Sequence, residues 1–344
     1  MPIEIRPGNL ESDGARLIEV IARWLTPRSD RQRFDWLYLN SPFGAARVWL
    51  AVRKEDDSIV GAAAAFPRRL YVEGTEVPAC VYGDFCVAPE QRSVGLALRL
   101  QRACFQALES GWAAIAYDFP SSSMTAIYER LQCGNRGPFV RMALPLRADR
   151  KIKQRIKNAS LAAIASSVVN GALSLRTKSL LTKRNWDISP VIGPCGEEFS
   201  HLAYELRGAD HVSLVRTSSY LNWRYVSHPF LRHEILAARR GDRLRGYLVF
   251  CQDSEQARLV DLFGVDDPGM FAALIGSAVE LLRPRGTTTL SAPILPSHPR
   301  AATLKRFGFF PRESSDVFYF LGPGAPAASL PLSLWFLMDG DRDS

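Results

Sequence analysis

Residues 84–97 of this 344-residue chain read Asp84-Phe85-Cys86-Val87-Ala88-Pro89-Glu90-Gln91-Arg92-Ser93-Val94-Gly95-Leu96-Ala97. This pattern predicts a β-strand, a tight turn and the first turn of a helix. The helix continues to Leu108, and four apolar residues recur along it at four-residue spacing, which predicts one buried stripe. The stripe consists of Leu96, Leu100, Cys104 and Leu108.

The junction between this strand and this helix has the features of an anion site. The first turn of a helix carries free N–H groups and the positive end of the helix dipole, and both favour phosphate. Gly95 lets the backbone approach a ligand closely, and Arg92 adds a permanent positive charge. The alternative is an ordinary strand-to-helix turn in which Ser93 caps the helix.

The segment Arg92-Ser93-Val94-Gly95-Leu96-Ala97 resembles the Arg/Gln-x-x-Gly-x-Gly/Ala pyrophosphate loop of the GNAT acyltransferases. The preceding Val87-Ala88-Pro89 resembles the end of their central strand. The resemblance implies that acetyl-CoA, or another acyl-CoA, is the co-substrate. It implies that the pantetheine arm and the reacting carbonyl contact the backbone amides of Phe85, Cys86 and Val87. The pyrophosphate would contact the amides of Arg92, Ser93, Val94, Gly95, Leu96 and Ala97.

Three side chains are candidates for proton transfer. Tyr128, on the helix predicted after the next strand, matches the leaving-group acid of the family, although a core tyrosine would show the same pattern. Asp84 on the central strand and Asp118 at the end of the next strand are candidates for the general base. Each aspartate has a structural alternative. Asp84 could be a buried carboxylate paired with an arginine, and Asp118 could cap a helix or a turn.

The chain repeats itself at an offset of 187 residues. Trp36-Leu37-Tyr38-Leu39-Asn40-Ser41-Pro42-Phe43 matches Trp223-Arg224-Tyr225-Val226-Ser227-His228-Pro229-Phe230 at its Trp, Tyr, Pro and Phe positions. Each segment precedes two strand-like runs that a polar turn joins. A period of this length repeats whole domains. In the first half, the predicted elements follow the order of a GNAT domain, with a closing strand at 139–144.

We therefore expect an α/β protein with two GNAT-like mixed-sheet domains in tandem, joined by a basic helical linker. The expected bounds are 1–146 for a catalytic domain that binds acyl-CoA, 147–195 for the linker, 196–321 for the second domain and 322–344 for a C-terminal tail. In the second domain, Asp266 and Asp267 occupy the turn that corresponds to the predicted phosphate loop. Their carboxylates would repel a pyrophosphate, so this domain is predicted not to bind cofactor.

The net charge of +8 is concentrated in the linker. Residues 150–184 contain nine Lys or Arg and no Asp or Glu, with small apolar residues at their centre. A basic helix with an apolar stripe can lie on an anionic membrane surface, which predicts a peripheral membrane contact. The alternative is a linker helix that packs its stripe on the two domains. Nucleic acid is disfavoured as a partner, because no aromatic residue lies among the basic ones before Trp186.

Cysteine and histidine spacing predicts no metal site. The six cysteines form no Cys-x-x-Cys pair, and the five histidines show no His-x-x-x-His spacing. Cys86 is therefore interpreted as a core thiol and not as a nucleophile. The amino terminus reads as a short strand and not as a signal peptide, and no apolar run is long enough to span a bilayer. These features favour a cytoplasmic protein, with contact at the inner face of the membrane.

The predicted function is an N- or O-acyltransferase that uses acyl-CoA, most simply acetyl-CoA, and transfers the acyl group directly to an amine or a hydroxyl. The acceptor would be a small molecule or a glycan, with an envelope intermediate as one hypothesis. One alternative is a cell-wall transferase that uses aminoacyl-tRNA, against which the intact phosphate loop argues. A second alternative is a non-catalytic protein that binds acyl-CoA.

Overall fold

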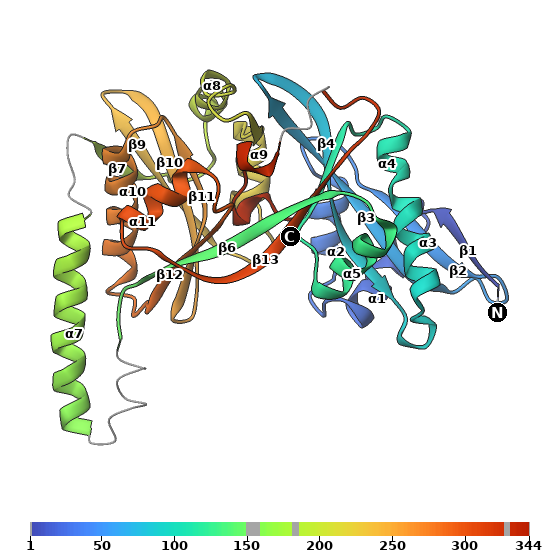
Figure 1. The fold of residues 1–344 in the computed structure, drawn as a ribbon, viewed down its shortest axis with the longest axis horizontal. Coiled ribbons are helices and arrows are strands. Elements are labelled where there is room, and N and C mark those ends of the chain that lie inside the picture. Colours follow the sequence, from blue (N-terminus) through green and yellow to red (C-terminus); the bar gives the residue numbers. More distant parts are fainter. Residues whose placement is uncertain (1, 149–158, 181–185, 327–330, 344) are drawn as a thin grey trace.

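The computed structural model describes residues 2–148, 159–180, 186–326 and 331–343. Over these residues the chain builds one continuous sheet of 14 strands, with helices on its faces (Figure 1). The main path of the sheet has the order β1-β2-β3-β4-β5-β13-β6-β12-β11-β10-β9-β7. The sheet is mixed: most neighbours are antiparallel, while β4 pairs with β5 and β11 with β12 in parallel.

Over its described residues, the first half supplies six strands, five α-helices and one π-helix. The strands are β1 (Ile3–Pro7), β2 (Arg47–Arg53), β3 (Ile59–Val72), β4 (Thr75–Val87), β5 (Ile115–Asp118) and β6 (Asn135–Pro145). The helices are α1 (Gly14–Trp24), α2 (Arg31–Phe34) with the π-helix η1 (Asp35–Leu39), α3 (Val94–Cys104), α4 (Gln106–Glu109) and α5 (Ser122–Leu131), and a 3-10 turn η2 (Pro89–Gln91) precedes α3. Their order agrees with the order that the sequence predicts.

The second half follows the helix α7 (Ala159–Leu180) and repeats the same plan. Its strands are β7 (Asp187–Pro190), β8 (Val212–Leu214), β9 (His233–Arg240), β10 (Arg243–Asp253), β11 (Gln256–Gly264), β12 (Thr289–Ile294), β13 (Phe310–Leu321) and β14 (Trp335–Phe336). Its helices are α8 (Glu197–Glu205), α9 (Ser218–Leu221), η3 (Asn222–Val226), α10 (Pro268–Leu282), α11 (Pro299–Arg306), η4 (Leu332–Leu334) and η5 (Asp339–Asp341).

The two halves exchange strands. β13, from the second half, lies between β5 and β6 of the first half, and β6 in turn pairs with β12 of the second half. Figure 1 shows β6 and β13 side by side, crossing from one half to the other. The closing strand expected at 139–144 lies within β6, and both strand neighbours of β6 come from the second half. The sheet does not divide at residue 146, because long antiparallel strands bridge the halves.

The sequence repeat forms the centre of the molecule. Both copies of the motif fold as π-helices, η1 and η3. The indole nitrogen of Trp36 donates to the carbonyl oxygen of Trp223 at 2.8 Å, and Trp223 donates to the carbonyl of Trp36 at 2.8 Å. The two rings stack with centroids 5.1 Å apart. This reciprocal contact places the two copies around a local pseudo-twofold axis.

Local features of the first half confirm the sequence pattern. The predicted stripe on α3 and α4 is buried, with exposed fractions of 0–6% at Leu96, Leu100, Cys104 and Leu108. Glu73 and Gly74 join β3 to β4 with φ angles of 48° and 82°. Positive φ at both positions is typical of the two-residue hairpin turn that suits the strand twist. Residues of the long β3–β4 hairpin that results line the cavity described below.

The linker contains the predicted helix. α7 packs against α10 at the edge of the second half, and Leu161 and Val168 on it are exposed. The basic flanks of this helix at 149–158 and 181–185 lie outside the described residues, so the membrane contact stays a prediction. Among the described helices, none combines the length and the apolar character that crossing a membrane requires.

Candidate functional site

The strands β4 and β5 separate at the centre of the first half. Their parallel pairing runs from Ala79 with Ile115 to Val81 with Tyr117, and β5 ends one residue later. β4 continues to Val87, so in the described part of the chain its edge toward β5 has no strand partner over this stretch. The register of β3 with β4 shifts beside it, and Asp84 has a φ of 45°. A bulge thus opens the strand where the sequence places the reacting carbonyl.

A cavity of about 1080 Å³ fills this wedge and continues to the first turn of α3. Ten of the twelve predicted site residues line it: Asp84, Phe85, Cys86, Val87, Arg92, Ser93, Val94, Ala97, Asp118 and Tyr128. The other two, Gly95 and Leu96, lie on α3 beside it. Leu96 belongs to the buried stripe, and Gly95 has no side chain. The structure therefore brings the predicted residues together around one cavity.

The first turn of α3 has a free surface at Gly95. A Cβ built on this glycine would meet no atom within 4 Å, so open space lies above the turn. Ser93 caps the helix by accepting a hydrogen bond from the Leu96 amide at 3.3 Å, as the structural alternative expected. Arg92 lies beside it and donates to the Val87 carbonyl at 3.3 Å. Capping uses one amide and leaves the rest of the turn able to receive an anion.

Tyr128 and Asp118 form a buried hydrogen-bonded pair on the cavity wall. The Tyr128 hydroxyl donates to Asp118 Oδ2 at 2.6 Å. Burial raises the pKa of Asp118 to about 7, against the opposing effect of this hydrogen bond, and raises the pKa of Tyr128 well above its usual range. The pair therefore gains or loses one proton close to neutral pH.

Asp84 is held by partners from the first repeat motif. Arg33 donates to both of its carboxylate oxygens, at 2.7 and 2.8 Å, and the Tyr38 hydroxyl donates to Oδ2 at 2.6 Å. Burial lowers the pKa of the Arg33 guanidinium, but the Asp84 carboxylate raises it more, so this pKa lies above its usual value. The paired alternative for Asp84 is thus confirmed. Both of its oxygens already accept hydrogen bonds, and its role as a general base stays a prediction.

Asp343 is a site residue that the sequence analysis missed. It lies half-buried on the cavity wall against Gly83, where a Cβ on the glycine would collide with the Asp343 carboxylate. Burial and the neighbouring Asp84 raise the pKa of Asp343. The available signal was the acidic run Asp339-Gly340-Asp341-Arg342-Asp343. A polar run of this kind is typical of an exposed tail, and its role depends on contacts that are remote in sequence.

The wedge of the second half is filled by the chain itself. β11 and β12 separate beyond the pair of Arg258 with Ser291, as β4 and β5 do. The segment from Met338 to Asp341 packs there: Met338 bridges to Ile294 of β12, and η5 packs on β11 and β12, while the preceding β14 pairs with β8. The side chains from Trp335 to Met338 are at most 1% exposed. The expected tail is therefore a core element over these residues.

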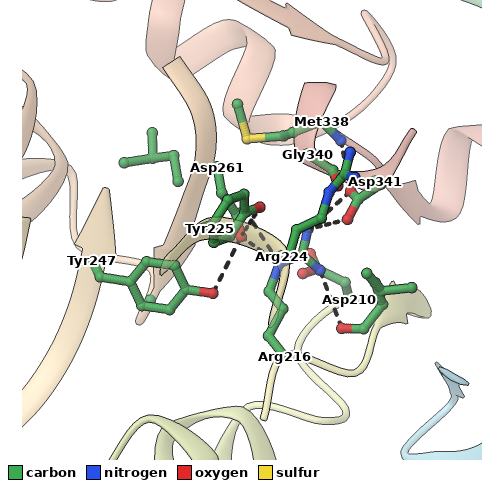
Figure 2. Close-up of polar contacts among 12 residues, drawn as sticks. Asp210, Arg216, Arg224, Tyr225, Tyr247, Asp261, Met338, Gly340 and Asp341 are labelled. Carbon is green, nitrogen blue, oxygen red and sulfur yellow. Dashed lines mark hydrogen bonds and ion pairs between the residues drawn. The ribbon is translucent and has the colours of Figure 1, made fainter. Parts of the chain in front are cut away.

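A buried ion-pair network anchors this segment (Figure 2). Arg216 donates to both oxygens of Asp341 at 2.9 Å and to Asp261 of β11 at 3.0 and 3.2 Å. The hydroxyls of Tyr225 and Tyr247 donate to the same Asp261, at 3.3 and 3.2 Å. Arg216, Asp261 and Tyr225 thus repeat the combination of Arg33, Asp84 and Tyr38 in the first half.

Cys86 lies at the core side of the opened strand. Burial raises the pKa of the Cys86 thiol to about 12, so the thiolate is scarce at neutral pH, as the core interpretation of this cysteine expects. Among the described residues, His, Cys, Asp and Glu side chains form no group of three that could hold a metal ion.

Comparison with known proteins agrees with this geometry. Residues 20–135 match the family model described as "Acetyltransferase (GNAT) domain". No curated protein matches the chain by sequence. Several solved structures match over nearly the whole chain.

A GCN5-related N-acetyltransferase from Anabaena variabilis is 14% identical, with a TM-score of 0.65, over 92% of this chain and 72% of the other. Eis1 from Mycobacterium abscessus is 16% identical, with a TM-score of 0.57, over 93% and 73%. The N-myristoyltransferase of Saccharomyces cerevisiae with bound myristoyl-CoA is 12% identical, with a TM-score of 0.57, over 94% and 80%. At these identities the likeness shows a shared fold.

Proposed function

We propose that this chain transfers an acetyl group from acetyl-CoA directly to an amine. The premise is that the chain carries a GNAT acetyltransferase domain and is an acyltransferase. One observation carries the proposal. A single cavity joins the open edge of β4 to the first turn of α3 and to the Asp118–Tyr128 pair. The open edge of β4 suits a thioester carbonyl, and the first turn of α3 suits a pyrophosphate. The Asp118–Tyr128 pair can supply a proton to the leaving sulfur.

The residues of the wedge fit acetyl-CoA. The open edge of β4 from Phe85 to Val87 offers amides to the pantetheine arm and to the oxygen of the reacting carbonyl. The first turn of α3 and Arg92 offer N–H groups and positive charge to the pyrophosphate. When bound, acetyl-CoA supplies an activated acyl group.

Three proton transfers accompany acyl transfer. The amine nitrogen forms a bond to the acyl carbon, the carbon–sulfur bond breaks, and the sulfur takes a proton from the Tyr128 hydroxyl. Protonated Asp118, a form present at neutral pH because its pKa is about 7, then gives its proton to the Tyr128 phenolate across their 2.6 Å contact, and the resulting carboxylate takes a proton back from solvent. This assignment follows the geometry, because the pair lies on the cavity wall beside the opened strand.

Asp343 takes the proton of the amine. Its carboxylate lies against Gly83, one residue before the bulge, and its raised pKa makes it a stronger base than an ordinary aspartate. Asp84 is less suited, because Arg33 and Tyr38 occupy its oxygens. In this proposal Asp84 and Arg33 hold the shape of the bulge and position Asp343.

The second half shapes the site without binding cofactor. Two observations support this part of the proposal. The segment ending at Asp341 fills its wedge. At the first turn of α10, Asp267 caps the helix by accepting from the Met270 amide at 3.0 Å, so a carboxylate already occupies the place of an anion.

Calorimetric titration with acetyl-CoA tests the proposal. We expect one site per chain in the wild type and its loss in Gly95→Asp, because the new carboxylate would project into the open space above the α3 turn. The matched variant is Asp267→Arg, at the corresponding turn of the second half. It should leave binding unchanged. No saturable binding to the wild type, or equal binding by Gly95→Asp, would overturn the proposed function.

A further inference from the structure

His228 lies on the wall of the cavity that the second half contributes. It occupies the place of Ser41 in the sequence repeat. Ser41 Oγ accepts a hydrogen bond from the Phe43 amide at 3.3 Å. His228 does the same with Nδ1, which accepts from the amides of Phe230 at 3.2 Å and Leu231 at 3.1 Å. The two copies thus form the same local turn. Unlike the serine, the histidine also has a second polar atom, Nε2, which this turn does not use.

The backbone contacts fix the tautomer of this ring. Because Nδ1 accepts two amide N–H groups, the proton of the neutral imidazole is on Nε2. Within the described residues Nε2 has no hydrogen-bond partner. The ring packs against Trp36 with the ring centroids 4.5 Å apart and the ring planes tilted by 48°. The geometry therefore gives the cavity a fixed N–H donor, and this nitrogen cannot serve as a base while it carries the proton.

The surroundings keep the ring uncharged. Burial lowers the pKa of His228 to about 3, and the positive charge of Arg224 acts in the same direction, with smaller effects of His233, Arg258 and Arg33. Burial likewise lowers the pKa of His233 to about 4. The donor at Nε2 is thus neutral at any pH at which an acyltransferase works.

The neighbouring wall is apolar with cations at its margin. Phe230 and Leu25 are large apolar residues with exposed fractions of 37% and 45%, and both line the cavity. Arg28 lines it as well, and no ion pair of this arginine occurs in the described part of the chain. Arg258 is tied to Asp339 at 3.0 Å. Asp253 lines the cavity beside Arg258 as well. An oxygen atom that accepts a hydrogen bond can therefore pair with Nε2 of His228, and an apolar group can contact Phe230.

We propose that this wall is a subsite for the acceptor, in which His228 donates from Nε2 to a carbonyl or carboxylate oxygen next to the acceptor amine. The substrate class is then an amine with an adjacent C=O group and an apolar side chain. The carboxylate of a free amino acid and the carbonyl of a peptide amino terminus share this chemistry. The inference rests on the proposed function, because it assigns the amine end of the same cavity.

Nitrogen NMR of histidine-labelled protein tests the inference. The chain has five histidines, and the His228→Ser variant identifies the signals of His228. We expect Nε2 to be protonated and Nδ1 unprotonated between pH 5 and 8. With CoA present, the probes are phenylalanine, phenylalaninamide and phenethylamine.

The first two probes carry the oxygen, as a carboxylate or as an amide, and the third lacks it. A shift of Nε2 with phenylalanine alone indicates a carboxylate, and a shift with phenylalaninamide indicates a carbonyl. A protonated Nδ1, no shift with either oxygen-bearing probe, or an equal shift with phenethylamine would overturn the inference.

Kinetics give a second readout. Serine at position 228 keeps the turn that Ser41 makes in the first repeat and removes only Nε2. For an oxygen-bearing probe that shifts the signal, the KM of His228→Ser should rise about tenfold, the size of one neutral hydrogen bond, with the KM of acetyl-CoA unchanged. Ser41→Ala is the control and should keep both values. An unchanged acceptor KM in His228→Ser would contradict the role.

The two proposals fail in different ways. If CoA does not bind to the labelled protein by calorimetry, the proposed function is wrong. If CoA binds but neither oxygen-bearing probe shifts the His228 signals, only the proposal of an acceptor subsite is wrong.

Discussion

Burial of a single carboxyl group sets the proton balance of the site. Asp118 lies at the end of β5 with 8% of its surface exposed, and its main polar partner is the Tyr128 hydroxyl. Desolvation raises its pKa to about 7, although the hydrogen bond favours the ionised form. The sequence predicts that this aspartate lies at the end of a strand. It does not predict how deeply the side chain is buried, because burial depends on how the helices pack on the sheet.

This pKa predicts a pH-dependent stability. A folded-state pKa above the unfolded value of about 3.9 gives stability that is complete at low pH and is lost as the pH rises through about 7. Between pH 6 and 8, the wild type should lose roughly 1 kcal/mol that Asp118→Asn does not lose. Thermal denaturation of both proteins at these two pH values measures it. Parallel pH dependences would show that Asp118 ionises normally.

The Tyr128 hydroxyl has a defined catalytic role in this account. Tyr128→Phe should lower kcat by roughly 10²-fold or more, the usual effect of a general acid, and should leave the KM of acetyl-CoA nearly unchanged. Thiol release from acetyl-CoA with an accepted amine measures both. Tyr82→Phe is the matched control, because Tyr82 lines the same cavity and its hydroxyl has no hydrogen-bond partner within the described residues. Equal losses in the two variants would contradict the role.

At the scale of elements, the β4 bulge and the segment around Asp343 form one unit. Gly83 is required there because the Asp343 carboxylate occupies the space of a side chain. The sequence predicts β4 and the helix after it correctly, since both follow from local periodicity. It could not give the partner of Asp84, which is Arg33, 51 residues away.

Gly83→Ala should displace Asp343 and lower kcat at least tenfold, with binding of acetyl-CoA retained. Asp343→Asn should have a similar effect, because both changes remove the same proton acceptor. The double variant tests the coupling: its loss should be no greater than that of the more severe single variant. Multiplication of the two losses in a thiol-release assay would mean that the residues act independently.

The Arg216 network fixes the segment that carries Asp343. Burial raises the pKa of Asp341 to about 6, and Arg216 opposes this rise. Arg216→Met would leave Asp341 and Asp261 buried without their cation. We expect a loss of about 3–5 kcal/mol in urea unfolding. Arg136→Met, at the exposed pair with Glu129, should cost less than about 1 kcal/mol. Similar losses in both variants would contradict an anchoring role.

At the scale of the whole molecule, strand exchange turns two repeats into one body. The 187-residue repeat predicts a duplication, and the structure brings the two copies of the motif into reciprocal contact through Trp36 and Trp223. The exchange of β6 and β13 could not be predicted, because the alternation of a strand shows its faces but not its neighbours. For the same reason, the sequence could not show that residues 338–341 fill the second wedge.

The central claim is that one wedge of this pseudo-symmetric molecule binds acyl-CoA, while the chain itself fills the other. A crystal structure of the protein with CoA tests it most directly. The account predicts density for one CoA per chain, with the pantetheine along β4 from Phe85 to Val87 and the pyrophosphate at the first turn of α3. Residues 338–341 should remain packed on β11 and β12. CoA at the first turn of α10, or CoA that displaces residues 338–341, would contradict the account.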